Sequence, residues 1–413
     1  MADPNTCLPL NRQSVLDARE LIKSHIHYTP VLTNRTIDEI ASSPQTAEAL
    51  KGTEWGGKEP ARPKIRLWFK CENLQRVGAF KVRGAFHALK RLEEAEGGVE
   101  AGHGEGGWRQ KGVVTHSSGN HAQALALAAR ELGIPAHIVM PTISTPSKIA
   151  ATKGYGANVR FSGSTSVERE AMVEEVMKET GAKLVPPYDH PDIIAGQGTM
   201  GLELAEQVRQ LQSERGIGNQ DGQETKGLDA IITPCGGGGM LSGVALSCEG
   251  RGIRVFGAEP EFQGADDGRR GFEQGERIES VKSLTIADGL RTPVGKIPWS
   301  VIFERRLVEN MYSVTEEQIK KAMRLVLERM KVVVEPSACV GLATVLFHEG
   351  FRGLVEREAG ERGWDVGVVF SGGNVGIEAL GGLFGEGSNG MEGERAEGKV
   401  GMDGVRIAEN VAG

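Results

Sequence analysis

The sequence lacks several features that would place it in a structural class at once. It has only five cysteines, none of them in a Cys-x-x-Cys pair, and their odd number cannot form a complete set of bridges. This argues against a disulfide framework and a structural zinc site, and it favours a reducing compartment. No apolar run reaches membrane-spanning length, and no signal-peptide pattern follows Met1. We therefore expect a cytoplasmic protein with no membrane-spanning segment.

An excess of basic residues is also absent. Lysine and arginine number 48 against 55 acidic residues, which gives a net charge of −7. Nucleic acid and anionic membranes attract basic surfaces, so the charge gives no reason to expect either as a partner. What is present is typical of a globular protein with a substantial core: 413 residues, 39% hydrophobic and 25% charged.

The order of the expected elements indicates the fold class. Between residues 112 and 189, short apolar strands alternate with helices. The strands are expected at 112–116, 136–140, 158–161 and 183–186, and the helices at 121–132, 146–153 and 167–179. This alternation predicts an α/β fold with a parallel sheet. We expect 112–189 to form a small domain of its own.

A larger α/β domain is expected from residues 1–111 and 190–385. Its strands are expected at 65–70, 228–233, 254–258 and 366–370, and its helices include 14–28, 82–95 and 201–212. Segments rich in glycine, serine and charge predict flexible inserts near 41–64, 96–108 and 213–227. The tail at 386–413 has little apolar periodicity, so we expect it to be disordered.

Four consecutive glycines, Gly236–Gly239, follow the strand at 228–233 and precede an apolar helix that starts near Met240. Without Cβ atoms, several backbone N–H groups can converge on one anion, and a helix start adds partial positive charge. This context favours a phosphate cradle over a merely flexible turn. No Gly-Lys-Ser/Thr follows, so the turn is not a P-loop, and it is not the usual dinucleotide-binding turn.

Two further polar turns are expected at strand ends. Ser371–Asn374 follows the strand at 366–370, and Ser117–His121 follows the strand at 112–116. The N–H groups of the second turn suit a carboxylate, although its polar side chains could also simply cap the next helix.

Lys81 lies at the start of the helix expected at 82–95. By itself it would be an ordinary surface lysine. In combination, however, the chain offers a lysine, a phosphate cradle, a carboxylate cradle and a serine at a strand end. A phosphate-bearing aldehyde held by lysine as a Schiff base would use all four, which predicts pyridoxal 5′-phosphate (PLP) as cofactor.

Five ordered motifs resemble the serine racemase and serine/threonine dehydratase family, PLP enzymes of the tryptophan-synthase-β fold (fold type II). The motifs are Ala79–Ala85, Thr115–Gln123, Ala195–Thr199, Gly236–Met240 and Ser371–Asn374. Within this family the chain is most similar to eukaryotic serine racemases and fungal 3-hydroxyaspartate ammonia-lyases. The resemblance runs from about Ser14 to Asn374 and implies two α/β domains with the cofactor between them.

The resemblance implies that Lys81 forms the Schiff base and then acts as the base at the substrate Cα. It also implies a phosphate site made of backbone N–H groups, those of Gly236, Gly237, Gly238, Gly239 and Met240.

Other matched residues would contact the cofactor ring and the substrate. Asn120 would bond to the ring hydroxyl, and Ser371 would face the ring nitrogen. A neutral serine there would leave that nitrogen largely unprotonated, which favours β-elimination over transamination. The substrate carboxylate would be received by Ser117, Asn120 and His121.

Ser118 is expected to decide the outcome of the reaction. In racemases of this family it stands on the face of the cofactor opposite the lysine, where inversion needs a second proton donor, and many bacterial threonine dehydratases have alanine there. The resemblance thus implies β-elimination from serine or threonine to a keto acid and ammonia, with serine racemase activity. Hydroxyaspartate ammonia-lyases keep the same serine, so threo-3-hydroxyaspartate stays open as the substrate.

Glu259, Ala265 and Asp267 resemble the divalent-cation site of the racemases. Two carboxylates with a backbone carbonyl suit Mg²⁺, Ca²⁺ or Mn²⁺. On spacing alone a solvent-facing acidic loop would be favoured. The segment between Glu259 and Asp267 is longer than in animal racemases, so the loop is expected to bulge.

The family also implies a homodimer. The residues that contact ATP in animal racemases are matched at Gln123, Tyr155, Lys331 and Asn374. They are not matched at Asn34, Arg35, Arg76 and Val77. The four unmatched positions argue against ATP as an effector.

Two other functions compete with this interpretation. Cysteine-synthase-type enzymes carry a Thr-Ser-Gly-Asn turn, whereas this chain has Ser117-Ser118-Gly119-Asn120. A non-catalytic binding or regulatory protein could keep the fold, but every residue needed for catalysis on an amino-acid substrate is present.

Overall fold

The computed structural model describes most of the chain. Contacts divide the chain into two units, which are described separately. The first ends at Asn374 and the second begins at Val375. In the second unit the described residues form α17 (Ile377–Phe384). The tail predicted at 386–413 and parts of two predicted inserts lie outside the described residues. The residues that the structure describes are 7, 9–97, 107–217 and 227–385.

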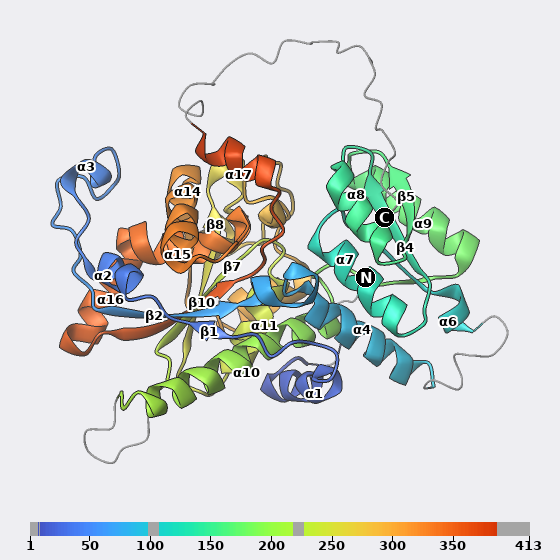
Figure 1. Cartoon of the computed structure of the whole chain (residues 1–413), viewed down its shortest axis with the longest axis horizontal. Coiled ribbons are helices and arrows are strands. Elements are labelled where there is room, and N and C mark those ends of the chain that lie inside the picture. Colours follow the sequence, from blue (N-terminus) through green and yellow to red (C-terminus); the bar gives the residue numbers. More distant parts are fainter. Residues whose placement is uncertain (1–6, 8, 98–106, 218–226, 386–413) are drawn as a thin grey trace, which may run out of the picture. The chain divides into compact units, whose positions relative to one another are not determined.

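The larger of the two sheets in the first unit has six strands (Figure 1). In spatial order they are β1 (Val31–Leu32), β2 (Ile65–Cys71), β10 (Trp364–Phe370), β7 (Ala230–Pro234), β8 (Arg254–Pro260) and β9 (Asn310–Val314). Only β1 and β2 pair in antiparallel fashion. Every residue of β7 and β10 is buried, as in central strands of a parallel sheet covered on both faces.

Helices cover both faces of this sheet. A Cβ on Gly367 in β10 would lie 2.8 Å from Leu204 of α10, whereas the adjacent Val368 lies toward Gly341 of α15. Successive residues of a strand face opposite sides, so α10 and α15 lie on opposite faces. The face covered by α10 (Pro191–Glu214) also carries α1 (Arg12–Ile22) and α11 (Gly239–Cys248). On the opposite face, α15 (Pro336–Phe347) packs with α14 (Glu316–Leu325) and α16 (Glu349–Ala359).

The smaller sheet has four parallel strands, all within residues 112–189. Their spatial order is β5 (Asn158–Ser162), β4 (Ala136–Pro141), β3 (Val113–His116) and β6 (Lys183–Leu184). Val113 packs in a core shared with α4 (Lys81–Ala95) and α7 (Asn120–Glu131), whereas Val114 packs against α9 (Ser166–Thr180). The alternation places α7 and α9 on opposite faces, and α8 (Pro146–Gly154) packs near β5. The exact limits of the two domains stay a prediction.

The structure corrects two of the expected helices. The helix expected at 201–212 begins ten residues earlier, at Pro191. Its glycines, which are unfavourable in a helix interior, allow close packing instead: a Cβ on Gly198 would lie 2.4 Å from Gly243 O of α11. The helix expected at 14–28 spans only Arg12–Ile22, capped by Asn11.

The structure adds helices to those expected above. Thr315 caps α14 by accepting from the Gln318 N–H. The short or additional helices are α2 (Arg35–Ser42), α3 (Ala47–Leu50), α6 (Trp108–Lys111), α12 (Asp267–Gln274) and α13 (Lys296–Trp299). In the described ranges no single helix has the length and apolar character to cross a membrane; α15 and residues 349–362 meet that measure only as a pair bent by 57°.

The segment predicted as a flexible insert near 41–64 is anchored to α16. Fully buried Arg352 donates to the backbone carbonyls of Ala41 (2.6 Å), Ser43 (2.6 Å) and Ala61 (3.1 Å). Its charge is paired with Glu349 at 2.8 Å. The mobility of the intervening residues stays a prediction.

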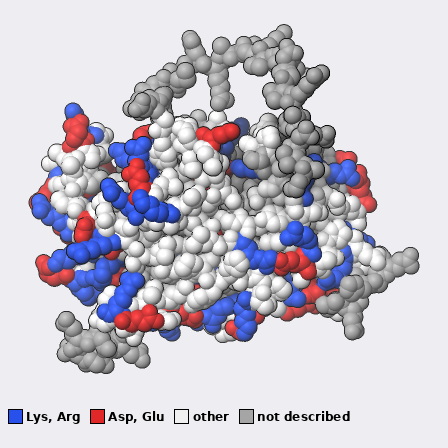
Figure 2. Space-filling view, viewed as in Figure 1, with Lys and Arg blue, Asp and Glu red and all other residues white. Residues whose placement is uncertain are grey.

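On the face seen in Figure 2, basic and acidic side chains are interspersed.

Candidate active site

Lys81 is the first residue of α4 and lies close to the end of β10. Phe80 N–H donates to Ser371 O at 3.0 Å, and Ala79 forms an isolated antiparallel bridge with Gly372. Parallel neighbours β2 and β10 both end here, so the chain segments that leave them meet. The structure therefore brings together Lys81 and Ser371, which come from two separate sequence motifs.

The side-chain amine of Lys81 is partly buried. Its Nζ donates to Pro187 O at 2.7 Å and lies 5.3 Å from the centroid of the Phe80 ring. Burial lowers the pKa of Lys81 to about 8. A larger fraction of the amine is then neutral, and hence nucleophilic, near neutral pH. This is the state that a Schiff-base lysine needs.

The glycine turn Gly236–Gly239 joins β7 to α11 and is completely buried. A Cβ on Gly237 would lie 2.4 Å from the Tyr188 ring, and Gly238 has a φ of 82°. Side chains are thus excluded for steric and backbone reasons. The first N–H groups of a helix have no carbonyl partner within it, so the turn and Met240 fit a phosphate group. Tyr188 follows Pro187, which places the turn next to the Lys81 amine.

The Ser117–His121 turn joins β3 to α7. Ser117 Oγ accepts from the Gly119 N–H at 3.3 Å. The His121 side chain is buried, with Nε2 3.2 Å from Val185 O. Burial, helped by the positive charge of Lys81, lowers the pKa of His121 to about 3. The ring is therefore neutral, and it is the backbone of this turn that could receive a carboxylate.

Asn120 connects this turn to the end of β10. Its Oδ1 accepts from Asn374 Nδ2 at 2.8 Å, and its Nδ2 donates to Glu335 Oε1 at 3.0 Å. Ser118, two residues earlier, is partly buried. The predicted ring-binding residue and the Ser371–Asn374 turn are thus in direct contact.

Glu335 is a site residue that the sequence interpretation missed. It precedes α15 and is 5% exposed. Its Oε2 accepts from the Asn374 N–H at 3.2 Å, and its own N–H donates to Gly372 O at 3.0 Å. Burial, followed by the charge of Asp288, raises the pKa of Glu335 to about 8. The sequence did hold a signal, an acidic residue placed between Val332–Val334 and a proline.

Behind Lys81 lies a buried group of four charges, which we term the salt-bridge cluster: Lys70, Glu72, Arg83 and Glu203. Arg83 binds Glu72 through two hydrogen bonds of 2.7 and 2.8 Å and Glu203 through two of the same lengths. Lys70 Nζ lies 2.6 Å from Glu203 Oε2. Burial alone would raise the pKa of Glu72, but Arg83 outweighs it and lowers that pKa. The cluster ties β2 and α10 to the first turn of α4.

Glu259 and Asp267, which we term the carboxylate pair, are also buried. Glu259 accepts from the N–H groups of Gly268 (3.0 Å) and Arg269 (2.7 Å), and Asp267 Oδ2 accepts from Val294 N–H (2.9 Å). Asp267 Oδ1 is buried and has no hydrogen-bond partner. Burial and mutual repulsion raise the pKa of Glu259, and burial raises that of Asp267 to about 7.

These features fit a divalent cation at the predicted place. Asp266 is already paired with Arg269 (2.5 Å) and Arg270 (3.0 Å), which leaves Asp267 as the available carboxylate. Ala265 is buried beside them. No group of three or more His, Cys, Asp or Glu side chains with metal-binding geometry occurs among the described residues. The remaining ligands would therefore be a carbonyl and waters, as hard cations accept.

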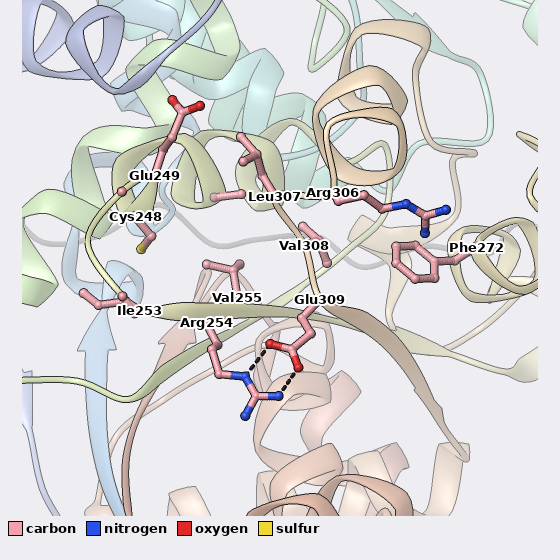
Figure 3. Close-up of a pocket in the computed structure, with 13 residues that line it drawn as sticks. Cys248, Glu249, Ile253, Arg254, Val255, Phe272, Arg306, Leu307, Val308 and Glu309 are labelled. Atoms are coloured by element: carbon pink, nitrogen blue, oxygen red, sulfur yellow. Dashed lines mark hydrogen bonds and ion pairs between the residues drawn. The ribbon is translucent and has the colours of Figure 1, made fainter. Parts of the chain in front are cut away.

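A separate cavity of about 410 Å³ lies between α11, β8 and the segment that leads to β9 (Figure 3). Its lining includes Glu249, Phe272 and the Arg254–Glu309 ion pair. None of the candidate site residues lines it, so it has no part in the site described above.

Comparisons with known proteins identify the family of this chain. The family model described as "Pyridoxal-phosphate dependent enzyme" matches residues 57–372. The chain is 39% identical to the L-threo-3-hydroxyaspartate ammonia-lyase of Saccharomyces cerevisiae, over 87% of this chain and 92% of that protein. It is also 39% identical to the serine racemase of Dictyostelium discoideum, over 89% and 96%.

The fold comparison gives the same result. The crystal structure of serine racemase from Dictyostelium discoideum superposes with a TM-score of 0.70 at 38% identity, covering 89% of this chain and 99% of that one. The fold is therefore that of the type II PLP enzymes, as the motifs predict.

Proposed function

The chain belongs to the family of pyridoxal-phosphate-dependent enzymes, and on this basis we propose that it is a serine/threonine ammonia-lyase with serine racemase activity. The reaction eliminates the β-hydroxyl of the amino acid and yields a keto acid and ammonia. The observation that carries the proposal is the place of Lys81 among the predicted motifs. On one side its neighbour Phe80 bonds to Ser371 O. On the other side the Lys81 amine bonds to Pro187 O, and the next residue, Tyr188, packs on the glycine turn.

The cofactor in this proposal is pyridoxal 5′-phosphate. The N–H groups of Gly236–Gly239 and Met240 would bind its phosphate, Asn120 would donate to the ring oxygen, and Ser371 would face the ring nitrogen. When bound, the cofactor supplies an electron-withdrawing ring that stabilises negative charge at the substrate Cα.

Lys81 then acts on the substrate. Its amine, with a pKa lowered to about 8 by burial, takes the Cα proton as a general base. Elimination breaks the Cβ–O bond, and the hydroxyl leaves as water after protonation. Hydrolysis of the released enamine returns that water and gives the keto acid and ammonia. The backbone of Ser117, Asn120 and His121 holds the substrate carboxylate while this happens.

Ser118 supplies a proton on the opposite face in this scheme. Return of a proton from Lys81 restores the starting enantiomer, whereas a proton from Ser118 Oγ inverts the Cα. Ser118 precedes α7 and is partly buried, which supports access to the site. The same pair of residues serves both activities, and the competition between elimination and inversion sets the product ratio.

Threo-3-hydroxyaspartate is the alternative substrate. The two relatives quoted above bear these two different activities in their names and are equally similar to this chain, at 39% identity. Similarity therefore does not choose between them. The β-hydroxyl and the α-carboxylate are the same in all candidate substrates, so the proposed roles of Lys81 and Ser118 are unchanged.

We also propose that Glu259, Asp267 and the carbonyl of Ala265 bind Mg²⁺, Ca²⁺ or Mn²⁺. The orphaned oxygen of Asp267 supports this. A homodimer in the cytoplasm completes the proposal, on the strength of the family resemblance. ATP is kept as a candidate effector to be added in the assays.

The test is to incubate the PLP-loaded protein with L-serine, D-serine, L-threonine and threo-3-hydroxyaspartate, and to measure keto acid and enantiomer ratio together. We expect keto acid from at least one substrate and D-serine from L-serine. Lys81→Ala should reduce turnover by about a thousandfold or more. Ser118→Ala should reduce racemisation about a hundredfold while elimination from one enantiomer persists.

Wild-type turnover in Lys81→Ala would sink the proposal. A cofactor spectrum that shifts with serine but releases no keto acid would support the non-catalytic binding protein instead. Keto acid from hydroxyaspartate alone would select the alternative substrate.

A further inference from the structure

Glu335 occupies a place where three parts of the site meet. Its carboxyl group accepts from the side chain of Asn120 at the start of α7 and from the backbone N–H of Asn374 after β10. Its backbone N–H donates to Gly372 O. The Glu335 side chain itself is buried, with 5% of the residue exposed. A Cβ on Gly372 would lie 2.7 Å from Glu335 Oε1, so the carboxyl group is also enclosed sterically.

These contacts select one orientation of the Asn120 amide. In the observed orientation Nδ2 donates to Glu335 and Oδ1 accepts from Asn374 Nδ2. Rotating the amide by half a turn would place an oxygen against the carboxyl group and an amino group against another amino group. Both hydrogen bonds would be lost, and the cost is greater at Glu335, whose contact with Asn120 is partly buried, than at the exposed Asn374.

The orientation leaves one donor available. An amide nitrogen carries two hydrogens, and Glu335 accepts only one of those on Asn120 Nδ2. The second hydrogen is free to bind an acceptor in the site. The amide oxygen, by contrast, is turned toward Asn374.

We propose that Glu335 is a positioning residue, which fixes the Asn120 amide so that its second Nδ2 hydrogen is presented to the ring oxygen of the cofactor. The inference rests on the proposed function, because it takes Asn120 as the ring-binding residue. Glu335 acts through Asn120 and does not itself contact the cofactor. Two charged groups shift the pKa of Glu335 in opposite senses: Asp288 raises it and Lys148 lowers it.

The test compares PLP affinity and the cofactor's visible absorbance band in four proteins: wild type, Glu335→Gln, Asn120→Ala and the double variant. Glutamine keeps the volume of Glu335 but sets an amino group against one of its two donors. We expect Glu335→Gln and Asn120→Ala each to weaken PLP binding about tenfold, as for one hydrogen bond. Both should displace the absorbance band, and the double variant should match Asn120→Ala alone.

Asp38→Asn is the matched control. Asp38 also has a carboxyl group whose pKa burial raises, to about 6, and it accepts a backbone N–H, that of Leu67, away from the site. We expect Asp38→Asn to change PLP affinity by less than about twofold and to leave the absorbance band unshifted. Glu335→Asp, which keeps the carboxyl group but shortens the side chain, serves if the glutamine variant fails to fold, and it should also weaken binding and displace the band.

The proposal is overturned if Glu335→Gln or Glu335→Asp binds PLP with wild-type affinity and spectrum while Asn120→Ala does not. It is equally overturned if the two effects multiply in the double variant, since independent residues would behave in that way. These results are distinct from failure of the proposed function, in which the wild-type protein would bind no PLP or release no product.

Discussion

The salt-bridge cluster and the carboxylate pair are both buried near the site, but they differ in composition. The cluster contains two cations and two anions, and every charged group in it has a partner within 2.9 Å. The carboxylate pair contains two acidic groups whose hydrogen-bond donors, within the described part of the chain, are backbone N–H groups. One of its oxygens has no partner among the described residues.

The difference separates a structural role from a binding role. A balanced cluster is complete without a ligand, and this one fixes the turn from which Lys81 projects. Two buried anions repel each other and are stable together only if they are protonated or share a cation. We therefore read the cluster as a support for Lys81 and the pair as an incomplete site. The predictions below test this distinction.

The largest effect is expected from Arg83→Met. This change leaves Glu72 and Glu203 buried without their main partner, which in comparable cases costs about 3–5 kcal/mol. The free energy of unfolding should fall by that amount in urea denaturation, and PLP binding should weaken because the start of α4 is no longer held. Arg254→Met is the matched control, since Arg254 also pairs with two carboxylates, Glu309 and Glu358, but partly exposed ones. Its cost should stay below about 1 kcal/mol, and equal losses in the two variants would contradict the comparison.

A smaller effect is expected at the carboxylate pair, and its sign depends on the cation. In the presence of a chelator, Asp267→Asn should be as stable as wild type or more stable, because one buried anion is removed. Adding Mg²⁺ at a hundred times its Kd should stabilise wild type by about 2.7 kcal/mol and Asp267→Asn much less. Thermal melts with EDTA, Mg²⁺ and Ca²⁺ measure this. If no cation changes the wild-type melt, the pair is not a cation site.

Sequence reasoning reached most of the site because its parts are local. The motifs around Lys81, the glycine turn and the Ser371 turn can each be recognised in a few consecutive residues. In a parallel sheet, the segments that follow neighbouring strands lie at the same edge, which brings such motifs together. Glu335 was missed because its role arises from contacts with residues 215 positions earlier and 39 positions later. The first half of α10 was missed because its glycines are unfavourable for an isolated helix. Close packing against α4 and α11 explains them: a Cβ on Gly196 would lie 2.7 Å from His87 Cβ, and one on Gly198 would lie 2.4 Å from Gly243 O.

Acid should weaken the salt-bridge cluster through Glu72. Arg83 holds the pKa of Glu72 below its usual value of 4.5, so the folded protein releases this proton more readily than the unfolded chain. The resulting stability is fully present above pH 4.5 and is lost as the pH falls through the folded pKa. Urea unfolding between pH 3 and 7 should therefore show a steeper acid loss in wild type than in Glu72→Gln. A parallel decline in the two proteins would mean that Glu72 is not the group responsible.

The smallest effect is expected from a partly exposed ion pair between α8 and the short turn at Asp288–Leu290. Lys148 of α8 lies 2.6 Å from Asp288, and their side chains are 32% and 41% exposed. Solvent screens such a pair, so Lys148→Ala should change the free energy of unfolding by about 0.2–1 kcal/mol, and less in high salt. The pair also acts on Glu335, whose pKa Asp288 raises and Lys148 lowers. Removing Lys148 should therefore raise the pKa of Glu335 further above its value of about 8, and infrared titration of its carboxyl band, assigned with Glu335→Gln, would measure that shift. Burial thus decides the role of an ion pair in this protein. A buried pair, such as those in the salt-bridge cluster, stabilises the turn that carries Lys81. An exposed pair, such as that of Lys148 and Asp288, contributes little stability and mainly shifts the pKa of Glu335.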